Sequence, residues 1–106
     1  MNAYIIDGYR SAVGKAPKGV FRFTRPDDLA AEVIKHLLSK VPALDSARVD
    51  DIIVGNAVPE AEQGMQMARY ISLLALGKTV PGITINRYCG SGVEAIAMAA
   101  GKIAAG

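Results

Sequence analysis

Cys89 is the residue of this chain best suited to chemistry, because it is the only cysteine and a thiolate is a strong nucleophile. It precedes Gly90-Ser91-Gly92 and stands between two apolar segments, at residues 83–85 and 93–105. If these form a strand and a helix, the sulfur lies at a helix N-terminus, whose free N–H groups and dipole favour the thiolate. The pattern therefore predicts a nucleophile at a strand-to-helix turn, where open α/β sheets place their ligand sites.

Other interpretations of this segment stay open on the residues alone. A lone cysteine is commonly a small buried apolar side chain. Ser91 is a second candidate nucleophile, but a serine needs an adjacent base, so hydrogen bonding in the first turn of the helix is favoured for it. Gly90 and Gly92 permit a tight turn and leave room for a substrate near the sulfur, as in the nucleophile elbow of serine hydrolases.

His36 is the only histidine and so the only imidazole that could serve Cys89 as a base. On a helical wheel it falls beside Glu32, Ser39 and Lys40, toward the polar side of a predicted helix. We therefore expect a solvated surface histidine without a catalytic role. The chain is predicted to hold a nucleophile and to lack its base.

The loop at residues 9–26 is long for a compact domain and rich in cations. These cations are Arg10, Lys15, Lys18, Arg22 and Arg25. Such charges suit a phosphate-bearing ligand such as a nucleotide or coenzyme A, but a solvated loop or a subunit contact is the favoured interpretation. The phosphate-cradling glycine patterns are absent, and one cysteine with one histidine excludes a cysteine-rich zinc site.

Short apolar runs alternate with helical periodicity along the chain, which predicts a βαβαβα unit of class α/β. We expect strands at residues 3–6, 52–54 and 83–85, and helices at residues 29–41, 65–76 and 93–105. Asp27 or Asp28 is the expected N-cap of the first helix. The run Ile52-Ile53-Val54 is continuously apolar, as in a parallel strand that is covered on both faces. Crossover helices between parallel strands are the economical topology.

The last helix is apolar nearly all round, since only Glu94 and Lys102 are strongly polar between residues 93 and 105. Such a helix is buried on several sides, and many of its residues are alanines that allow close approach. Three strands and two other helices cannot supply that cover. We therefore infer that much of the cover lies outside these 106 residues, and that the chain is a fragment or one subunit of something larger.

Composition narrows the classes of protein further. The chain has 106 residues, 51% of them apolar, and a net charge of +2 on interspersed charges. This describes one domain or part of one, without the basic stripe of a nucleic-acid-binding protein. No apolar run reaches the ~18 residues of a membrane span. One cysteine and no evident signal peptide predict a reducing, cytoplasmic location, with organelles not excluded.

The segment Asn86-Arg87-Tyr88-Cys89-Gly90-Ser91-Gly92 resembles the nucleophile segment of the thiolase family. The resemblance covers essentially the whole chain, in order and at the right spacing. Its other segments are Tyr9-Arg10-Ser11-Ala12-Val13-Gly14-Lys15, Asp51-Ile52-Ile53-Val54-Gly55-Asn56, Gln63-Gly64-Met65-Gln66-Met67-Ala68-Arg69 and Val80-Pro81-Gly82-Ile83-Thr84-Ile85-Asn86. In detail the chain is most similar to the degradative 3-ketoacyl-CoA thiolases, or acetyl-CoA acyltransferases.

The resemblance implies a fold of two similar α/β halves in five layers, α-β-α-β-α, with the helix after the nucleophile in the middle layer. Residues 1–106 would be the N-terminal part of the N-terminal domain, the first quarter of the enzyme. It also implies that Cys89 attacks a 3-ketoacyl-CoA, that acetyl-CoA leaves, and that coenzyme A cleaves the acyl-enzyme, as in fatty-acid β-oxidation. Coenzyme A is then a substrate, and neither a cofactor nor a metal is required.

The family's later motifs are not in this chain: a Gly-His-Pro histidine, a second Cys-x-Gly segment and an Asn-Glu-Ala-Phe segment. Only Cys89 carries over as a catalytic residue, and we expect no turnover from the chain alone. The expected partners are acyl-CoA, coenzyme A and the remainder of the chain or a second subunit, in a homodimer or tetramer whose contact lies at the third strand. Nucleic acid and membrane are not expected.

Two alternatives remain at this point. One is a related condensing enzyme, either an acetoacetyl-CoA-forming biosynthetic thiolase or a ketoacyl synthase, although the Asn-x-x-Cys-Gly-Ser-Gly form favours a thiolase. The other is a non-catalytic interaction protein on the thiolase scaffold.

Overall fold

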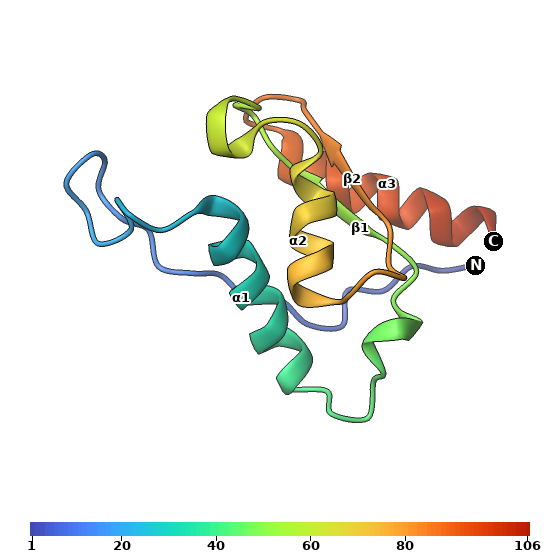
Figure 1. Cartoon of the computed structure of the whole chain (residues 1–106). Helices are drawn as coiled ribbons and strands as arrows, with labels where there is room; N and C mark the ends of the chain where they lie inside the picture. The colour runs from blue at the N-terminus through green and yellow to red at the C-terminus, as the bar shows by residue number, and fades with distance from the viewer.

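The computed structural model describes all of residues 1–106 and has an α/β architecture (Figure 1). Its regular elements are α1 (Pro26–Ser39), β1 (Ile52–Gly55), α2 (Met67–Ala75), β2 (Gly82–Ile85) and α3 (Ser91–Ala105), with short 3₁₀ turns at Ser46–Arg48 and Ala61–Gln63. The two strands pair in parallel, with Ile52 opposite Gly82 and Gly55 opposite Ile85. The predicted α/β class and parallel strands are therefore confirmed.

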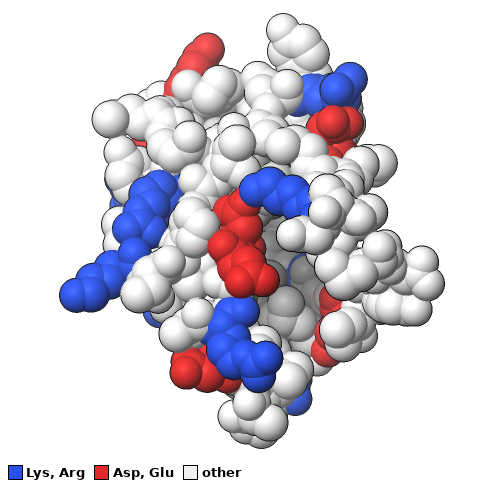
Figure 2. All heavy atoms as spheres, turned by 90° about the vertical axis from the view of Figure 1, so that its right-hand side faces the viewer, with Lys and Arg blue, Asp and Glu red and all other residues white.

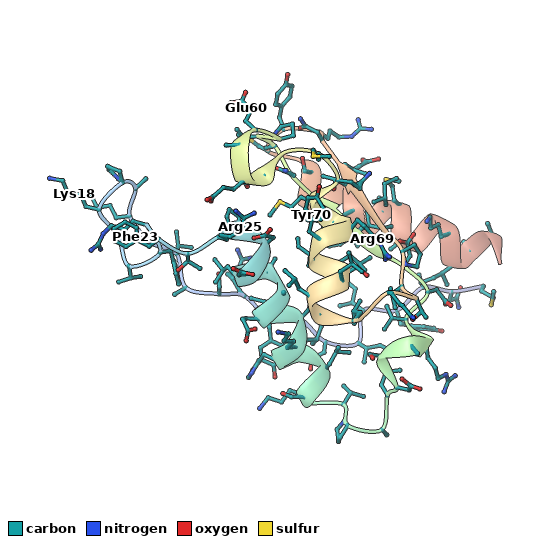
Figure 3. All side chains as sticks on the ribbon, viewed as in Figure 1. Lys18, Phe23, Arg25, Glu60, Arg69 and Tyr70 are labelled. Atoms are coloured by element: carbon teal, nitrogen blue, oxygen red, sulfur yellow. The ribbon has the colours of Figure 1, made fainter.

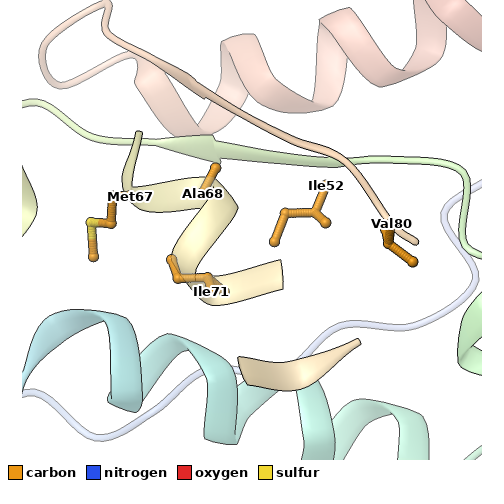
Figure 4. Close-up of a cluster of buried hydrophobic side chains, with 5 residues drawn as sticks. All are labelled: Ile52, Met67, Ala68, Ile71 and Val80. Carbon is orange, nitrogen blue, oxygen red and sulfur yellow. The ribbon is translucent and has the colours of Figure 1, made fainter. Parts of the chain in front are cut away.

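The elements form layers in the order α3, sheet, α2, α1. Helix α3 covers one face of the sheet and α2 the other, while α1 packs on the outer side of α2 (Figures 1 and 4). This is the arrangement expected when α2 is the crossover between two parallel strands. The continuous apolar run of β1 is explained by its position between two helices.

The core lies between β1 and α2. It consists of Ile52, Met67, Ala68, Ile71 and Val80 (Figure 4). Arg69 and Ser72 of α2 both donate hydrogen bonds to the carbonyl oxygen of Val80, at 2.7 and 2.6 Å, and so hold the chain before β2 against the helix. Only 10 of the 106 residues are buried, so this core is small for the length of chain.

The strand predicted at residues 3–6 does not form, which corrects the expected βαβαβα order. Residues 1–14 make no backbone-to-backbone hydrogen bond, and Tyr4, Ile5 and Ile6 are 76–90% exposed. An apolar run becomes a strand only when a neighbour takes up its backbone N–H and C=O groups. Here the sheet has only the two strands β1 and β2.

The N-cap expected at Asp27 or Asp28 is also wrong. Helix α1 begins at Pro26, with Arg25 as its N-cap residue. Proline at the first helical position is pre-organised for the helix, so α1 starts before the two acids. Asp27 still serves the helix start, because its carboxylate accepts a hydrogen bond from the N–H of Asp28 at 3.0 Å.

Helix α3 is uncovered over most of its surface. Ser91 is its only buried residue, whereas Val93, Ile96 and Ile103 are 75, 57 and 45% exposed. The expectation that these 106 residues do not bury the helix is thus confirmed. None of the helices combines the length and the apolar character needed to cross a membrane.

Candidate active site

Cys89 lies in the turn between β2 and α3, as the sequence predicts. Parallel strands end at the same edge of the sheet, so the turn lies next to Gly55 and Asn56 at the end of β1. Cys89 is exposed and its thiol is free. The prediction of a strand–Cys–helix arrangement is confirmed, and these 106 residues do not bury the cysteine.

The turn contains one strained residue, Tyr88, immediately before the cysteine. Its φ is +47°, in the left-handed region that a residue with a side chain rarely adopts. The carbonyl of Arg87 accepts a hydrogen bond from the N–H of Gly90 at 3.0 Å, which closes the turn. Gly90 itself has an ordinary φ of −87°. The glycines are expected to permit the tight turn, but it is Tyr88 that adopts the positive φ.

Ser91 holds the two residues before Cys89 from inside the turn. Its hydroxyl accepts a hydrogen bond from the N–H of Arg87 at 2.9 Å and donates one to the carbonyl of Tyr88 at 2.7 Å. Its own N–H donates to the same carbonyl at 3.1 Å. Ser91 is 5% exposed, and the two bonds of its hydroxyl are part-buried. The predicted hydrogen-bonding role of Ser91 is confirmed.

The end of β1 supports Ser91 from behind. A Cβ atom on Gly55 would lie 2.7–2.8 Å from the backbone and Cβ of Ser91, closer than real atoms approach. Only glycine permits this contact between the end of β1 and the start of α3. By contrast, a Cβ on Gly92 would meet nothing within 4 Å, so that glycine leaves open space beside the turn.

Three backbone N–H groups at the turn and the start of α3 form no hydrogen bond within the chain. These groups belong to Cys89, Gly92 and Val93. They are the free donors that every helix N-terminus presents, and all three residues are exposed. The turn can therefore present a sulfur nucleophile and free N–H donors on the same exposed surface.

An ion pair crosses the turn on its outer side. Arg87 Nε lies 3.0 Å from Glu94 Oε2, with the two side chains 69 and 32% exposed. Exposed pairs of this kind contribute about 0–1 kcal/mol. The part-buried bonds of Ser91 are therefore the stronger restraint on the turn.

His36 is not part of this site. It lies on α1, is exposed, and meets the ring of Tyr9 edge to face with centroids 4.6 Å apart. Figure 1 shows the second half of α1 at the opposite side of α2 from the β2–α3 turn. The prediction of a surface histidine is confirmed.

The cationic loop before α1 does not reach Cys89 either. Its basic residues are all exposed, and Lys18 and Phe23 lie at its outer end, far from the turn (Figure 3). The Arg22 guanidinium stacks over the Phe23 ring at 4.7 Å. Arg25 donates two hydrogen bonds to Asp27, at 2.9 and 3.0 Å, and lies 3.6 Å from Glu62. These bonds from the Arg25 guanidinium hold the pKa of Asp27 below its ordinary value.

An open groove lies elsewhere, between α3 and residues 50–53. Ile53, Ala99 and Ile103 line it, and Lys102 pairs with Asp51 at its rim. Figure 2 looks at this side of the molecule, which is hollowed and carries interspersed acidic and basic groups. The groove does not include Cys89. No group of three His, Cys, Asp or Glu side chains is placed to hold a metal ion.

Sequence reasoning missed Gly55 and Tyr88. A glycine at the end of an apolar strand is a signal of close backbone approach, and Gly55 carried that signal. No sequence rule singles out a tyrosine for the left-handed region. In the structure, the side chains of Ser91 and Asn86 both form hydrogen bonds around Tyr88.

The similarity to known proteins extends over nearly the whole chain. Residues 3–106 match the family model described as thiolase, N-terminal domain. The chain is 51% identical over 105 residues to a 3-ketoacyl-CoA thiolase of Bacillus subtilis, with 98% of this chain and 27% of that protein covered. It is 42% identical over 106 residues to one of Serratia proteamaculans (99 and 27% covered) and 48% over 101 residues to one of Acinetobacter baumannii (94 and 26%). The chain thus spans about a quarter of the length of these relatives.

Proposed function

Because this chain belongs to the thiolase family, we propose that residues 1–106 are the N-terminal part of a thiolase N-terminal domain and supply the enzyme's nucleophile, Cys89. The enzyme is an acyltransferase that cleaves 3-ketoacyl-CoA with coenzyme A, in the degradative direction of fatty-acid β-oxidation. The relatives named 3-ketoacyl-CoA thiolase support the substrate class.

One observation carries the proposal. Cys89 is an exposed thiol on a rigidly bonded turn, at the carboxyl edge of a parallel sheet and the start of a 15-residue helix. A nucleophile needs access for its substrate and a fixed direction of attack, and this turn supplies both.

The proposed reaction has two halves. The Cys89 sulfur gives up its proton and bonds to the C3 carbonyl carbon, the C2–C3 bond breaks, and the carbanion of acetyl-CoA leaves and is protonated. Coenzyme A then loses its thiol proton, attacks the thioester and releases the Cys89 thiolate, with a shortened acyl-CoA as product. Thioester exchange is nearly balanced in energy, which suits a sulfur nucleophile. His36 is too remote to be the base, so the base comes from beyond these residues.

The free N–H groups of the turn have a role in the same reaction. When sulfur adds to a carbonyl, negative charge develops on the carbonyl oxygen, and pre-positioned N–H donors stabilise it. The N–H of Cys89 is unbonded and beside the reacting atom, so we assign it as one such donor. Coenzyme A is a substrate here, and the proposed chemistry requires no metal or bound cofactor.

The test is a chimera in which residues 1–106 replace the matching segment of the Bacillus subtilis 3-ketoacyl-CoA thiolase. We expect thiolysis of a 3-ketoacyl-CoA by the chimera, and a fall of at least 1,000-fold in kcat for Cys89→Ala, since a covalent nucleophile has no substitute (about 4 kcal/mol or more). Incubation with acetyl-CoA should add one acetyl group to Cys89, detected by peptide mass spectrometry.

A matched control is Ser46→Ala, in a 3₁₀ turn between α1 and β1. It should keep the activity of the parent chimera. A folded chimera whose Cys89 neither becomes acetylated nor matters for turnover would contradict the proposal and favour a non-catalytic scaffold. We also propose a cytoplasmic location and a homodimer or tetramer.

A further inference from the structure

We infer that Ser91 is a positioning residue: its buried hydroxyl holds Tyr88 in the left-handed conformation and thereby aims Cys89. The inference rests on the proposed role of Cys89 as nucleophile. It adds a residue that neither reacts nor touches the substrate.

The first step is the geometry of the turn. Between the end of β2 at Ile85 and the start of α3 the chain must reverse its local course in five residues. It does so through a positive φ at Tyr88, the residue directly before Cys89. A change of that one dihedral angle would redirect both the Cys89 N–H and its side chain.

The second step is what maintains this conformation. Tyr88 is 77% exposed, so packing of its ring does not fix it. The Ser91 hydroxyl bonds to the Arg87 N–H on one side and the Tyr88 carbonyl on the other, at 2.9 and 2.7 Å. The Asn86 side chain also accepts a hydrogen bond from the Tyr88 N–H, at 2.8 Å, but that bond is exposed. Strained backbone persists only where its surroundings over-determine it, and Ser91 makes the part-buried side-chain bonds that help to do so here.

Ser91 is itself held in place by burial and by its contact with Gly55. It is 5% exposed and abuts Gly55 so closely that no Cβ fits between them. The end of β1 therefore fixes the position of Ser91, and the hydrogen bonds of Ser91 fix the turn. The Arg87–Glu94 pair also crosses the turn, but it is exposed and screened by water.

The chain offers a matched control in Ser72. Ser72 is also a buried serine, and its hydroxyl donates to a backbone carbonyl, that of Val80, at 2.6 Å. It lies on α2, away from the β2–α3 turn. Ser91→Ala and Ser72→Ala thus remove the same atom from two buried serines, and only Ser91 lies in the turn.

The experiment compares both variants in the chimera, by kinetics and by alkylation of Cys89. We expect Ser91→Ala to lower kcat about 10- to 100-fold with KM for coenzyme A within twofold, since small misplacement of a reacting group has effects of this size. The rate of alkylation by iodoacetamide at pH 7 should fall about two- to fivefold. A fall of this size corresponds to losing the stabilisation that a helix N-terminus gives to a nearby negative charge. Ser72→Ala should leave both rates within twofold.

Gly55→Ala provides a second route to the same defect. It leaves every hydrogen-bonding group in place but pushes Ser91 outward, so it should lower kcat in the direction of Ser91→Ala. Equal effects of Ser91→Ala and Ser72→Ala at equal thermal stability, or no effect of Ser91→Ala, would overturn the positioning role.

The two proposals fail differently. If the parent chimera is folded but has no turnover while Ser91→Ala still slows alkylation selectively, the proposed function is wrong and the positioning of Cys89 stands. If the parent turns over normally and Ser91→Ala changes neither kcat nor alkylation, the function stands and the inference on Ser91 is wrong.

Discussion

Asp27 is the one buried carboxylate of the chain, and its neighbours explain why it is charged there. The Arg25 guanidinium donates two hydrogen bonds to it and the Asp28 N–H a third, all of which favour the ionised form. Its pKa is therefore lowered from the ordinary value of 3.8. The pair joins the long basic loop to the start of α1.

Replacing Asp27 by Asn should lower the free energy of unfolding by about 1 kcal/mol at pH 7, a value reduced for the half-exposed Arg25. A lowered pKa in the folded state means that protonation favours unfolding. The contribution of Asp27 is thus complete above its ordinary pKa and is lost as the pH falls through its folded pKa. Urea unfolding of the 106-residue chain at several pH values, followed by circular dichroism, measures this.

Asp28→Asn is the control, because Asp28 is exposed in the same turn and makes no bond to Arg25. It should cost less than Asp27→Asn at pH 7. An Asp27→Asn deficit that stays constant down to acid pH would contradict the expected linkage.

Among single residues, the sequence predicted what depends on type and spacing. It placed Cys89 at a strand-to-helix turn, Ser91 in first-turn hydrogen bonds and His36 on the surface. It missed the left-handed Tyr88 because that conformation results from contacts between β1, β2 and α3. It misplaced the N-cap of α1 because Asp27 and Asp28 both suit that position while Pro26 favours an earlier start.

At the scale of elements, two glycines with opposite surroundings test the packing. A Cβ on Gly82 would lie 2.6 Å from the Ala68 carbonyl oxygen, so β2 approaches α2 as closely as the backbone permits. A Cβ on Gly101, inside α3, would meet nothing within 4 Å. Replacement by alanine should therefore change the free energy of unfolding in opposite directions at the two positions.

Gly82→Ala should destabilise the 106-residue chain by about 1–3 kcal/mol, because backbone must shift to admit the methyl group. Gly101→Ala should stabilise it by about 0.5–1 kcal/mol, the usual gain in a helix interior. Thermal unfolding followed at 222 nm compares them directly. A Gly82→Ala variant as stable as the parent would mean that β2 does not pack against α2 in this way.

The sequence predicted β1, β2 and the three helices to within a few residues, because their apolar periodicity is strong. It also predicted a strand at residues 3–6, which shares the composition of β1 but has no pairing partner in this structure. The apolar pattern of a sequence shows which residues suit a strand, but a strand forms only where a neighbouring strand pairs with it. The difference between β1 and residues 3–6 therefore lies in tertiary contacts.

The molecule as a whole leaves many large apolar side chains exposed to water. The radius of gyration is 14.1 Å, against about 13 Å for a compact domain of this length. Helix α3 carries Val93, Ile96 and Ile103 exposed, while Cys89 stands at its first turn. The exposed apolar face of this helix fits the expectation, drawn from the resemblance to thiolases, that the helix packs in a middle layer of the whole fold.

The 106-residue chain alone should therefore show no thiolysis, since it holds the proposed nucleophile but neither a base near it nor cover for its helix. Mixing it with the Bacillus subtilis 3-ketoacyl-CoA thiolase from which the matching quarter has been removed should restore turnover, because α3 then regains packing partners and Cys89 meets the rest of the site. Native mass spectrometry should show the two polypeptides bound in equal numbers. A mixture made with Cys89→Ala should bind equally and remain inactive, which separates assembly from chemistry. Thiolysis by the pure chain, lost on Cys89→Ala, would show that these residues already form a complete site.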